Sequence, residues 1–360
     1  MTTLRLVADD LTGALDSGAQ FTGCAGPLPV LIGPTVAVPT GSFALNLSCR
    51  DGARAEAIAA ARCSIPYFAG ADLAFKKIDS LMRGHWAAEL AEIAKSGAFE
   101  RIVVAPAFPA QGRLTRAGRQ VHVNAEGGDV LIADIAADLS RHGVVARSAA
   151  DGEGRGRIVL LDASSQADLD AISQRSDEAS TLWCGTAGLA RALAGRPASV
   201  ACLPDGPHLV IVGSHHPVAQ RQVAELARLR PDWLTAFDAE AEASAERIHK
   251  ALAAHGRCVA LPDLPAGLTS PEAARLIAER LQALCRRLAP PAVLTVVGGE
   301  TLAALCLGLG ASRLLVKGEL HPGVPTFRLV MGSWTGTICF SKSGAFGPAN
   351  WLIEQLRAEH

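Results

Sequence analysis

The sequence predicts an α/β protein made of two layered domains, with largely parallel sheets and an inter-domain cleft. Apolar runs of strand length alternate with alanine-rich helical stretches along almost the whole chain, a pattern typical of parallel βαβ units. The chain has 360 residues, more than one hydrophobic core usually accommodates. The alternation breaks in the stretch 195–208, which contains three prolines. We interpret that stretch as a linker between a domain 1–200 and a domain 205–360.

In the first domain, strands are expected at the apolar runs and helices between them. The expected strands are Leu4 to Ala8, Leu28 to Ile32, Ser42 to Leu47, Leu73 to Lys76, Arg101 to Ala105 and Ile158 to Asp162. The expected helices are Thr12 to Gln20, Ala53 to Arg62, His85 to Lys95, Leu131 to Arg141, Gln166 to Ser173 and Thr186 to Leu193. Because crossovers between parallel strands are right-handed, the loops after these strands should lie along one sheet edge.

The second domain repeats this alternation. Its expected strands are His208 to Gly213, Trp233 to Phe237, Cys258 to Leu261, Val293 to Val297, and two near Phe327 and Ile338. Its expected helices are Val218 to Leu229, Ala241 to Ala254, Pro271 to Leu288 and Leu302 to Leu309.

Composition narrows the functional classes. The formal net charge of −1 and the absence of dense basic runs argue against a nucleic-acid partner or a polybasic membrane patch. No apolar run approaches membrane-spanning length. The nine cysteines form no C-x-x-C pair, which favours reduced thiols over disulfides or a zinc site. We therefore expect a cytoplasmic protein without nucleic-acid or membrane partners.

Two adjacent carboxylates, Asp9 and Asp10, stand where the first strand ends and the first helix begins. That position is the carboxyl edge of an α/β sheet, where ligands bind. Unpaired carboxylates cost several kcal/mol when they are desolvated, so this pair needs cations, hydroxyl groups or a metal nearby. The alternative is that Asp10 only caps the following helix.

The segment 76–84 follows another strand and therefore falls at the same edge. It carries Lys76, Lys77, Asp79, Ser80 and Arg83. Arginine binds carboxylate or phosphate in a bidentate manner and lysine acts as a point charge. These cations either hold an anionic ligand or neutralise the two aspartates.

Two more loops leave strands with polar side chains. The segment 105–115 has a path constrained by two prolines and offers Gln111, Arg113 and Thr115, and rigid loops at strand ends often carry binding residues. The segment 46–50 offers Ser48 and Arg50 as donors. Taken alone, this second segment fits a helix cap followed by a surface arginine better.

Three turns in the second domain indicate an anion site. The sequence Gly298-Gly299-Glu300-Thr301 joins a strand to a helix, where glycines let backbone N–H groups approach a phosphate. The turns Gly213-Ser214 and Lys342-Ser343-Gly344 are comparable. Together they suggest a phosphate-bearing nucleotide. The pair His215-His216 has no third ligand at suitable spacing, so we expect no protein metal site.

The ordered set of these motifs resembles the four-carbon acid sugar kinase family, over nearly the whole chain. The motifs are Ala8 to Ala14, Lys76 to Ser80, Arg83-Gly84, Pro106 to Pro109, Gly112-Arg113, Gly213-Ser214, Gly298 to Thr301, Pro322 to Pro325, Lys342 to Gly344 and Phe346-Gly347. The family phosphorylates threonate, erythronate or 2-oxo- and 3-oxo-tetronates with ATP, in sugar-acid catabolism. The resemblance implies a sugar-acid-binding N-terminal domain and a nucleotide-binding C-terminal domain.

By that resemblance, Ser214, Gly298, Gly299, Glu300, Thr301 and Gly344 would contact ATP. Phosphoryl transfer depends on positioning and charge stabilisation, with Mg²⁺ on the phosphates and a carboxylate accepting the hydroxyl proton. We expect Asp10 or Asp79 as that base. Substrate contacts are expected from Asp9, Ser48, Arg50, Lys77, Ser80, Arg83 and Arg113. A homodimer is the default assembly.

The chain departs from the family pattern at several positions. Leu81-Met82 stand where the family has Thr-Leu, His216 where it has Ser, Ala219 where it has Thr, and Ala345 where it has Asn. The segment after Asn124 is shorter. These departures leave a second hypothesis open, a degenerate member that senses a sugar acid or nucleotide without transferring phosphate. A nicotinamide-dependent oxidoreductase is a third, and it lacks the dinucleotide fingerprint.

Overall fold

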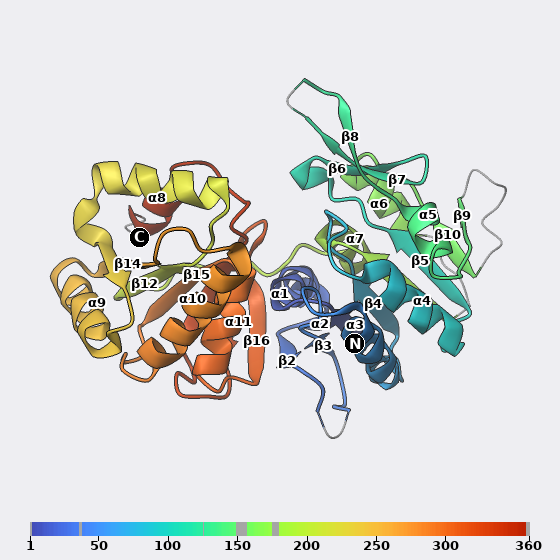
Figure 1. Ribbon diagram of the computed structural model, residues 1–360. Helices are drawn as coiled ribbons and strands as arrows, with labels where there is room; N and C mark the ends of the chain where they lie inside the picture. Colours follow the sequence, from blue (N-terminus) through green and yellow to red (C-terminus); the bar gives the residue numbers. More distant parts are fainter. Residues whose placement is uncertain (1, 36–37, 125, 149–156, 175–179, 358–360) are drawn as a thin grey trace. The chain divides into compact units, whose positions relative to one another are not determined.

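The computed structural model describes residues 2–35, 38–124, 126–148, 157–174 and 180–357. Its internal contacts divide the chain into two compact units, Met1–Ser199 and Val200–His360. Figure 1 colours the first unit from blue to green and the second from yellow-green to red. Each unit contains a run of mainly parallel strands with helices around it, which confirms the predicted α/β class.

The strands of the first unit are arranged about β1. Their order is β2 (Leu28–Ile32), β3 (Phe43–Asn46), β1 (Leu4–Ala8), β4 (Leu73–Lys77), β11 (Thr181–Gly185), β5 (Arg101–Ala105), β10 (Ile158–Leu160) and β9 (Ala146–Ser148), and all pairs are parallel. The chain leaves β1 toward β2 and leaves β4 toward β5, in opposite directions along the sheet. The carboxyl ends of β1 and β4 thus form a topological switch point, where open α/β sheets bind ligands.

Helices of the first unit pack in two groups. One group holds α3 (Arg54–Ser64), α4 (Trp86–Ser96) and α5 (Ile135–Ser140); the other holds α1 (Leu11–Gln20), α7 (Ala187–Ala194) and α6 (Gln166–Ser173), with the short α2 (Thr22–Ala25) after α1. Val7, Leu45 and Leu90 belong to the buried core between strands and the α3–α4 layer. Burial of such side chains contributes about 1.5–3 kcal/mol each, which fixes the strand ends that carry the polar loops.

A small antiparallel sheet projects from the first unit (Figure 1). It consists of β6 (Arg113–Arg116), β7 (Arg119–Val123) and β8 (Asp129–Asp134). The predicted helix Leu131 to Arg141 is wrong in its first part, because Leu131 pairs with Val121 across the sheet. Only α5 after it is helical. The strand β11 at the centre of the parallel sheet was not predicted at all.

The second unit has its own switch point. Its order is β13 (Leu234–Phe237), β14 (Arg257–Pro262), β12 (His208–Val212), β15 (Val293–Val297), β18 (Ile338–Lys342), β17 (Val324–Leu329) and β16 (Arg313–His321). The first five run parallel, and β17 is antiparallel to both its neighbours. The chain leaves β12 toward β13 and β15 toward β16, so the loops after β12 and β15 meet where the order reverses.

Two helices of the second unit begin at these loops, α8 (Pro217–Leu229) after β12 and α11 (Gly299–Gly308) after β15. The others are α9 (Ala241–His255), α10 (Ser270–Cys285) and α12 (Trp351–Arg357), which follow β13, β14 and β18. Val212, Phe340 and Trp351 share one buried core. Neither β16 nor α12 was predicted, and α10 ends before the predicted Leu288.

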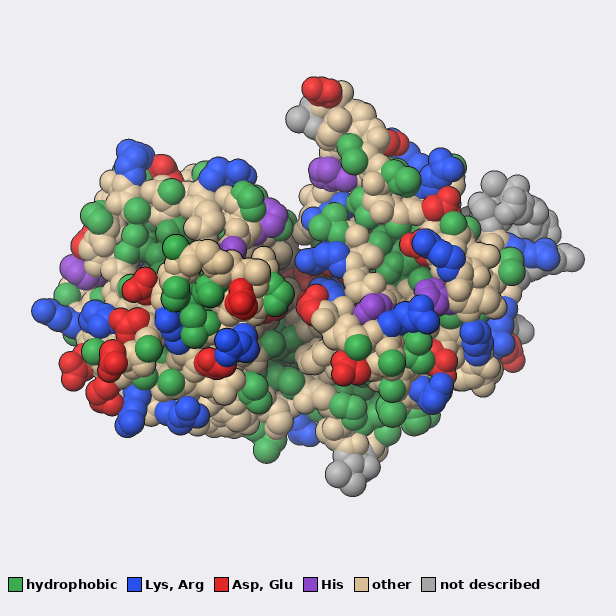
Figure 2. Space-filling model, in the orientation of Figure 1, with side chains coloured by type: hydrophobic (Ala, Val, Ile, Leu, Met, Phe, Trp, Pro, Cys, Tyr) green, Lys and Arg blue, Asp and Glu red, His purple; other side chains and the backbone are tan. Residues whose placement is uncertain are grey.

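On the face shown in Figure 2, acidic and basic side chains are interspersed on both units, with no large field of one sign. This fits the near-zero formal charge of −1. Within the described ranges, no helix has the length and apolarity needed to cross a membrane.

Candidate active site

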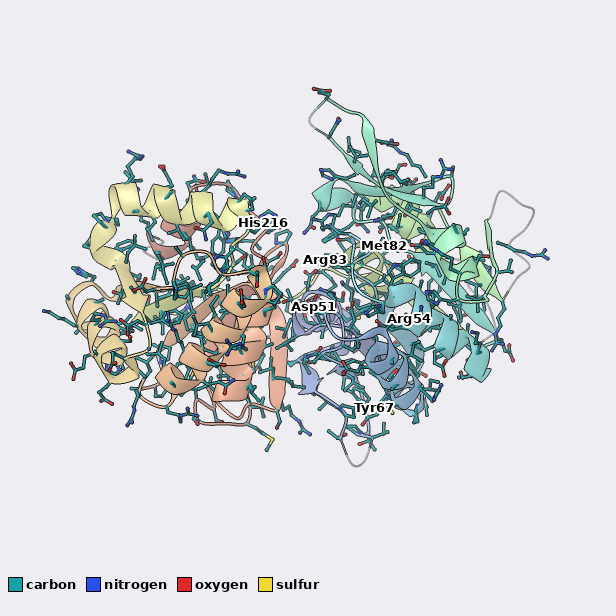
Figure 3. All side chains as sticks on the ribbon, in the orientation of Figure 1. Asp51, Arg54, Tyr67, Met82, Arg83 and His216 are labelled. Carbon is teal, nitrogen blue, oxygen red and sulfur yellow. The ribbon has the colours of Figure 1, made fainter. Side chains whose placement is uncertain are left out.

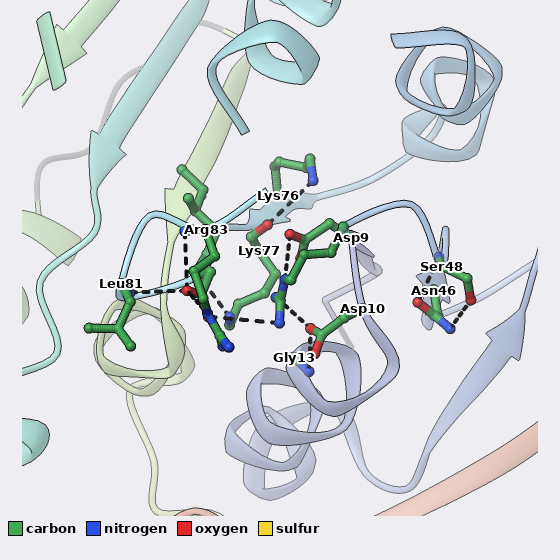
Figure 4. A network of polar contacts seen from close by, with 12 residues as sticks. Asp9, Asp10, Gly13, Asn46, Ser48, Lys76, Lys77, Leu81 and Arg83 are labelled. Carbon is green, nitrogen blue, oxygen red and sulfur yellow. Dashed lines mark hydrogen bonds and ion pairs between the residues drawn. The ribbon is translucent and has the colours of Figure 1, made fainter. Parts of the chain in front are cut away.

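A polar network occupies the switch point of the first unit (Figure 4). The loops after β1, β3 and β4 bring together Asp9, Asp10, Arg50 and Asp79. The parallel register places Ala8 beside Asn46, and Val7 beside Lys76. Side chains that directly follow these strands therefore meet, although about 70 residues of chain separate the first loop from the third.

Arg50 is the cation at the centre of this network. Its Nε and Nη2 donate to Asp9 at 2.9 and 2.7 Å, and Nη2 also donates to Asp10 at 2.6 Å. Its Nη1 lies 3.8 Å from Asp79. The Arg50 side chain is 8% exposed, so the interpretation of Arg50 as a surface arginine is wrong. The bidentate geometry makes the pair with Asp9 a strong charge-assisted interaction.

Asp10 combines the two roles that the sequence left open. It is the N-cap of α1 and accepts from the Gly13 N–H at 2.8 Å, and it is also an ion-pair partner of Arg50. A Cβ atom on Gly13 would lie 2.5 Å from the Asp10 carboxylate and 3.2 Å from the Lys77 ammonium. Glycine at position 13 is therefore required by the close approach of these two groups.

Asp79 is held by the loop that contains it and by Arg83. The Leu81 and Arg83 N–H groups donate to its carboxylate at 3.2 and 3.3 Å. The Arg83 guanidinium adds a bidentate pair at 2.8 and 2.9 Å. Figure 3 labels Arg83 and Met82 on this loop. Met82 adopts a left-handed φ of 55°, a costly conformation for a side chain of its size.

Burial and the neighbouring charges shift the pKa values of the three aspartates in different directions. Burial disfavours the ionised form of Asp9, but the charge and hydrogen bonds of Arg50, together with the charges of Lys76 and Lys77, outweigh burial, and the pKa of Asp9 is lowered. Burial also opposes ionisation of Asp79, yet hydrogen bonds from Arg83 and the charge of Arg50 hold its pKa well below the usual range. For Asp10, burial and repulsion by Asp9 exceed the effect of Arg50, so its pKa is raised.

Lysines 76 and 77 have separate environments. Lys76, predicted as one of three converging cations, turns away from the loop and pairs with Glu89 at 2.7 Å in the interior. The Lys77 ammonium donates to the Ile78 carbonyl at 2.9 Å and lies beside Gly13 and Asp10. Only Lys77 of the two is therefore at the site.

Ser80 and Arg113 connect the loops after β4 and β5. The Arg113 Nη1 donates to Ser80 Oγ and to Gln111 Oε1, each at 2.5 Å. Beneath them, the Gln120 side-chain amide donates to the Ser80 and Pro106 carbonyls, both at 3.1 Å. Gln120 was not predicted, because nothing in the sequence of β7 signals that it reaches another loop. Thr115, predicted as a polar tip, is buried and bonds to Gln120.

The loop after β3 presents Ser48 in an unusual conformation. Ser48 has a left-handed φ of 52°, a region that costs non-glycine residues of order 1–3 kcal/mol. The buried Asn46 stabilises it, since its amide nitrogen donates to Ser48 Oγ at 2.8 Å and its oxygen accepts from the Ser48 N–H at 3.0 Å. Asn46 is a second residue that the sequence did not single out. Figure 4 draws the Asn46–Ser48 pair to one side of the network, and the contacts drawn for Ser48 are those with Asn46.

In the second unit, the turns after β12, β15 and β18 converge as the sequence suggested. Gly298 has a φ of +115°, and a Cβ atom there would lie 2.9 Å from Thr301 Oγ1 and 3.3 Å from Ser214 Cβ. A Cβ atom on Gly344 would meet the Ser214 side chain. Glycines at 298 and 344 thus leave space beside Ser214, at the start of α11.

The remaining predicted residues of this unit lie on the same turns. Gly299 and Glu300 form the first turn of α11. His216 caps α8, accepting from the Val218 N–H at 3.2 Å, and Figure 3 labels it at the start of that helix. Among the described side chains, no cluster of three or more His, Cys, Asp or Glu residues could hold a metal ion.

Comparison with protein families matches each unit to one model. Residues 4–134 match the sugar-binding N-terminal domain, and residues 209–352 match the nucleotide-binding C-terminal domain. These ranges contain the polar network of the first unit and the three glycine-rich turns of the second.

Relatives resemble the chain over nearly its full length. A D-threonate kinase from Cupriavidus necator is 30% identical, with 98% of each chain covered. A D-threonate kinase from Bordetella bronchiseptica is 30% identical over 99% of this chain and 97% of its own. A D-erythronate kinase from Heliobacterium modesticaldum is 26% identical over 96% and 94%.

Solved structures share the fold. A Salmonella typhimurium LT2 protein gives a TM-score of 0.78 at 20% identity, with both chains fully covered (100%). A Haemophilus influenzae protein gives 0.71 at 18% identity, covering 98% of this chain and 99% of its own. Together with the full-length relatives, the two matched domains show that this chain belongs to the four-carbon acid sugar kinase family.

Proposed function

We propose that this protein transfers the γ-phosphoryl group of ATP to a hydroxyl group of a four-carbon sugar acid, such as D-threonate or D-erythronate. The observation that carries the proposal is Asp10, a carboxylate of raised pKa at a sheet switch point, in a chain related over its full length to kinases of these acids. In the reaction, the hydroxyl oxygen attacks the γ-phosphorus, the bond to the bridging oxygen of ADP breaks, and a carboxylate accepts the hydroxyl proton.

Asp10 suits the role of base better than Asp79. A base must be able to accept a proton near the working pH. Two backbone N–H groups and Arg83 hold Asp79 in its ionised form, with a lowered pKa. The Asp10 side chain is 19% exposed and has a raised pKa. We therefore assign proton acceptance to Asp10 and give Asp79 the task of orienting Arg83 and Arg50.

Binding of the acid is assigned to the cations around the network. Arg83 is 61% exposed at its side chain while its guanidinium stays tied to Asp79. Lys77, Arg113 and Ser48 complete the candidate contacts for the carboxylate and hydroxyl groups of the substrate. The Nε and Nη2 groups of Arg50 already donate to Asp9 and Asp10, so we propose that Arg50 fixes these carboxylates and that Asp9 holds Arg50 in place.

ATP binding is assigned to the turns of the second unit. Ser214, Gly298 and Gly344 form a cradle without bulky side chains beside the first turn of α11, and the N–H groups of a first helical turn suit phosphate oxygens. Mg²⁺ commonly binds one or two carboxylates together with phosphate oxygens. We propose that the phosphate oxygens of the nucleotide would hold Mg²⁺, which would neutralise part of their charge.

The test is an ADP-release assay over both enantiomers of threonate and erythronate and their oxo derivatives. Threitol and erythritol serve as matched controls, because they keep the hydroxyl groups and lack the carboxylate. Turnover with at least one acid, and not with its polyol, supports the proposal. Binding of an acid or of ADP without turnover would instead favour the sensor hypothesis.

A further inference from the structure

Lys342 is a buried cation without a carboxylate partner. The residue is 1% exposed. Its ammonium group donates to the Ser343 carbonyl at 3.0 Å and lies 5.1 Å from the centre of the Trp351 ring. In the described part of the chain it forms no ion pair, and burial lowers its pKa to about 8.

The first unit also contains a buried lysine near a strand end, but that lysine has a carboxylate partner. Lys76 is 2% exposed near the end of β4, and Glu89 neutralises it at 2.7 Å. Leaving a buried charge uncompensated costs several kcal/mol. Around Lys342 the described residues place a carbonyl group and an aromatic ring but no carboxylate, so its charge is less fully compensated than that of Lys76.

The location of Lys342 explains why an unpaired lysine stands at this position. It is the last residue of β18, directly before Ser343 and Gly344, and its carbonyl accepts from the Gly298 N–H at 2.9 Å. Its main chain thus joins the turn after β15, and its side chain supports the turn after β18. Helix α11 begins at the turn after β15, and α8 begins at the turn after β12, whose Ser214 lies against Gly344. Helix N-termini favour anions.

We propose that Lys342 supplies the buried positive charge that binds the phosphate groups of the nucleotide at these turns. This inference rests on the proposed function and adds a residue to the nucleotide site. The phosphate gains a full charge where the glycine-rich turns offer only N–H dipoles, and the ammonium gains the anion that it lacks.

The described residues around Lys342 include no carboxylate paired with its ammonium group, so a bound anion can neutralise it. Val297 on β15 is its register partner, Trp351 of α12 covers it, and Gln222 of α8 holds the adjoining loop through the Phe346 carbonyl at 3.0 Å. Val324 begins β17 on the other side. The charged residues and histidines on α8, α11, α12 and the turn before α8 are His215, His216, Arg221, Glu225, Arg228, Glu300, Glu354 and Arg357. Glu225 pairs with Arg228, and Glu354 accepts from Asn350.

The test is calorimetric titration of the full-length protein with ADP at pH 9, in two buffers of different ionisation enthalpy. A lysine whose pKa is lowered by burial to about 8 is mostly unprotonated at pH 9, whereas ADP is fully ionised at that pH. Binding of phosphate should recharge the lysine, so we expect net proton uptake at pH 9 that disappears at pH 6.5. ADP binding without proton uptake at pH 9 would overturn the inference and leave the kinase proposal standing.

Variants separate a phosphate contact from a structural role. Lys342→Met keeps the length of the side chain and removes the charge; we expect about 10- to 100-fold weaker ADP binding, from the value of charge-assisted hydrogen bonds. Adenosine, which lacks phosphate, should bind the variant and the wild type equally. Lys342→Arg should retain most of the ADP affinity. Equal losses for ADP and adenosine would overturn the inference, and if Lys342→Met does not fold, the wild-type proton uptake decides alone.

Discussion

Replacing Arg50 by methionine should lower the free energy of unfolding, because three neighbouring carboxylates would lose their shared cation. In the wild type, Arg50 satisfies Asp9 and Asp10 and lies near Asp79, with its side chain 8% exposed. Removing one partner of a buried ion pair costs about 3–5 kcal/mol. A domain is usually stable by only about 5–15 kcal/mol, so the variant should lose a large fraction of its free energy of unfolding at pH 7.

The loss should depend on pH, with a definite sign. In the wild type, Asp9 and Asp79 have lowered pKa values, so their stabilising contribution is present above the unfolded value near 4 and fades as pH falls below it. Without Arg50, burial should raise the pKa of Asp9 above the unfolded value. That penalty is greatest at neutral pH and is relieved by protonation. The difference between wild type and variant should therefore shrink from pH 7 to pH 4.5.

Urea unfolding at the two pH values measures this difference. Arg62→Met is the matched control, since Arg62 forms an arginine–carboxylate contact of the same length, 2.7 Å to Glu92, with its side chain 66% exposed. Surface pairs contribute little, so the control should unfold nearly as the wild type does. A loss for Arg50→Met below about 1 kcal/mol, or one equal at both pH values, would refute this account of the network.

Three further substitutions test the two sites and the buried pair beside the first one. Asp10→Asn should lower turnover by about 10²- to 10⁴-fold while the dissociation constant for ATP stays nearly unchanged; equal losses of both would count against separate ligand sites. The raised pKa of Asp10 should also make wild-type kcat/KM fall on acidification at a pH above the ordinary carboxylate range near 4. Gly298→Ala places a Cβ atom 2.9 Å from Thr301 Oγ1 at a φ of +115°, so ADP affinity should drop without a change in sugar-acid binding. Glu89→Gln leaves Lys76 unpaired in the interior and should reduce the free energy of unfolding by about 3–5 kcal/mol; unchanged urea midpoints would contradict the buried pair.

Strands of the parallel sheets were predictable because their sequences are short apolar runs that end in polar turns. The runs Leu4 to Ala8 and Val293 to Val297 have the predicted bounds. The prediction of a helix from Leu131 was wrong, because the segment 129–134 is a strand without the pattern of a buried one. Its apolar residues Val130 and Leu131 are exposed on an antiparallel sheet, and a short apolar run does not distinguish a strand from a helix.

The fold class was enough to predict that the site residues lie at one sheet edge. It was not enough to predict which cation pairs with which carboxylate. Parallel strands bring their carboxyl ends to one edge, so Asp9, Asp10 and Asp79 were expected together. Which cation faces them depends on side-chain direction and loop conformation: Arg50 takes that place, and Lys76 pairs in the core. Gln120 acts through carbonyl groups of distant loops, a contact that only the folded backbone creates.

The central claim is phosphoryl transfer to a sugar acid, and mass spectrometry of the product tests it most directly. The protein is incubated with D-threonate or D-erythronate and with ATP that carries ¹⁸O on its γ-phosphoryl group. The account predicts a phosphorylated acid that retains the three non-bridging labelled oxygens, and no such product with Asp10→Asn in the same time. Labelled inorganic phosphate alone, in the presence of every four-carbon acid tested, would contradict it.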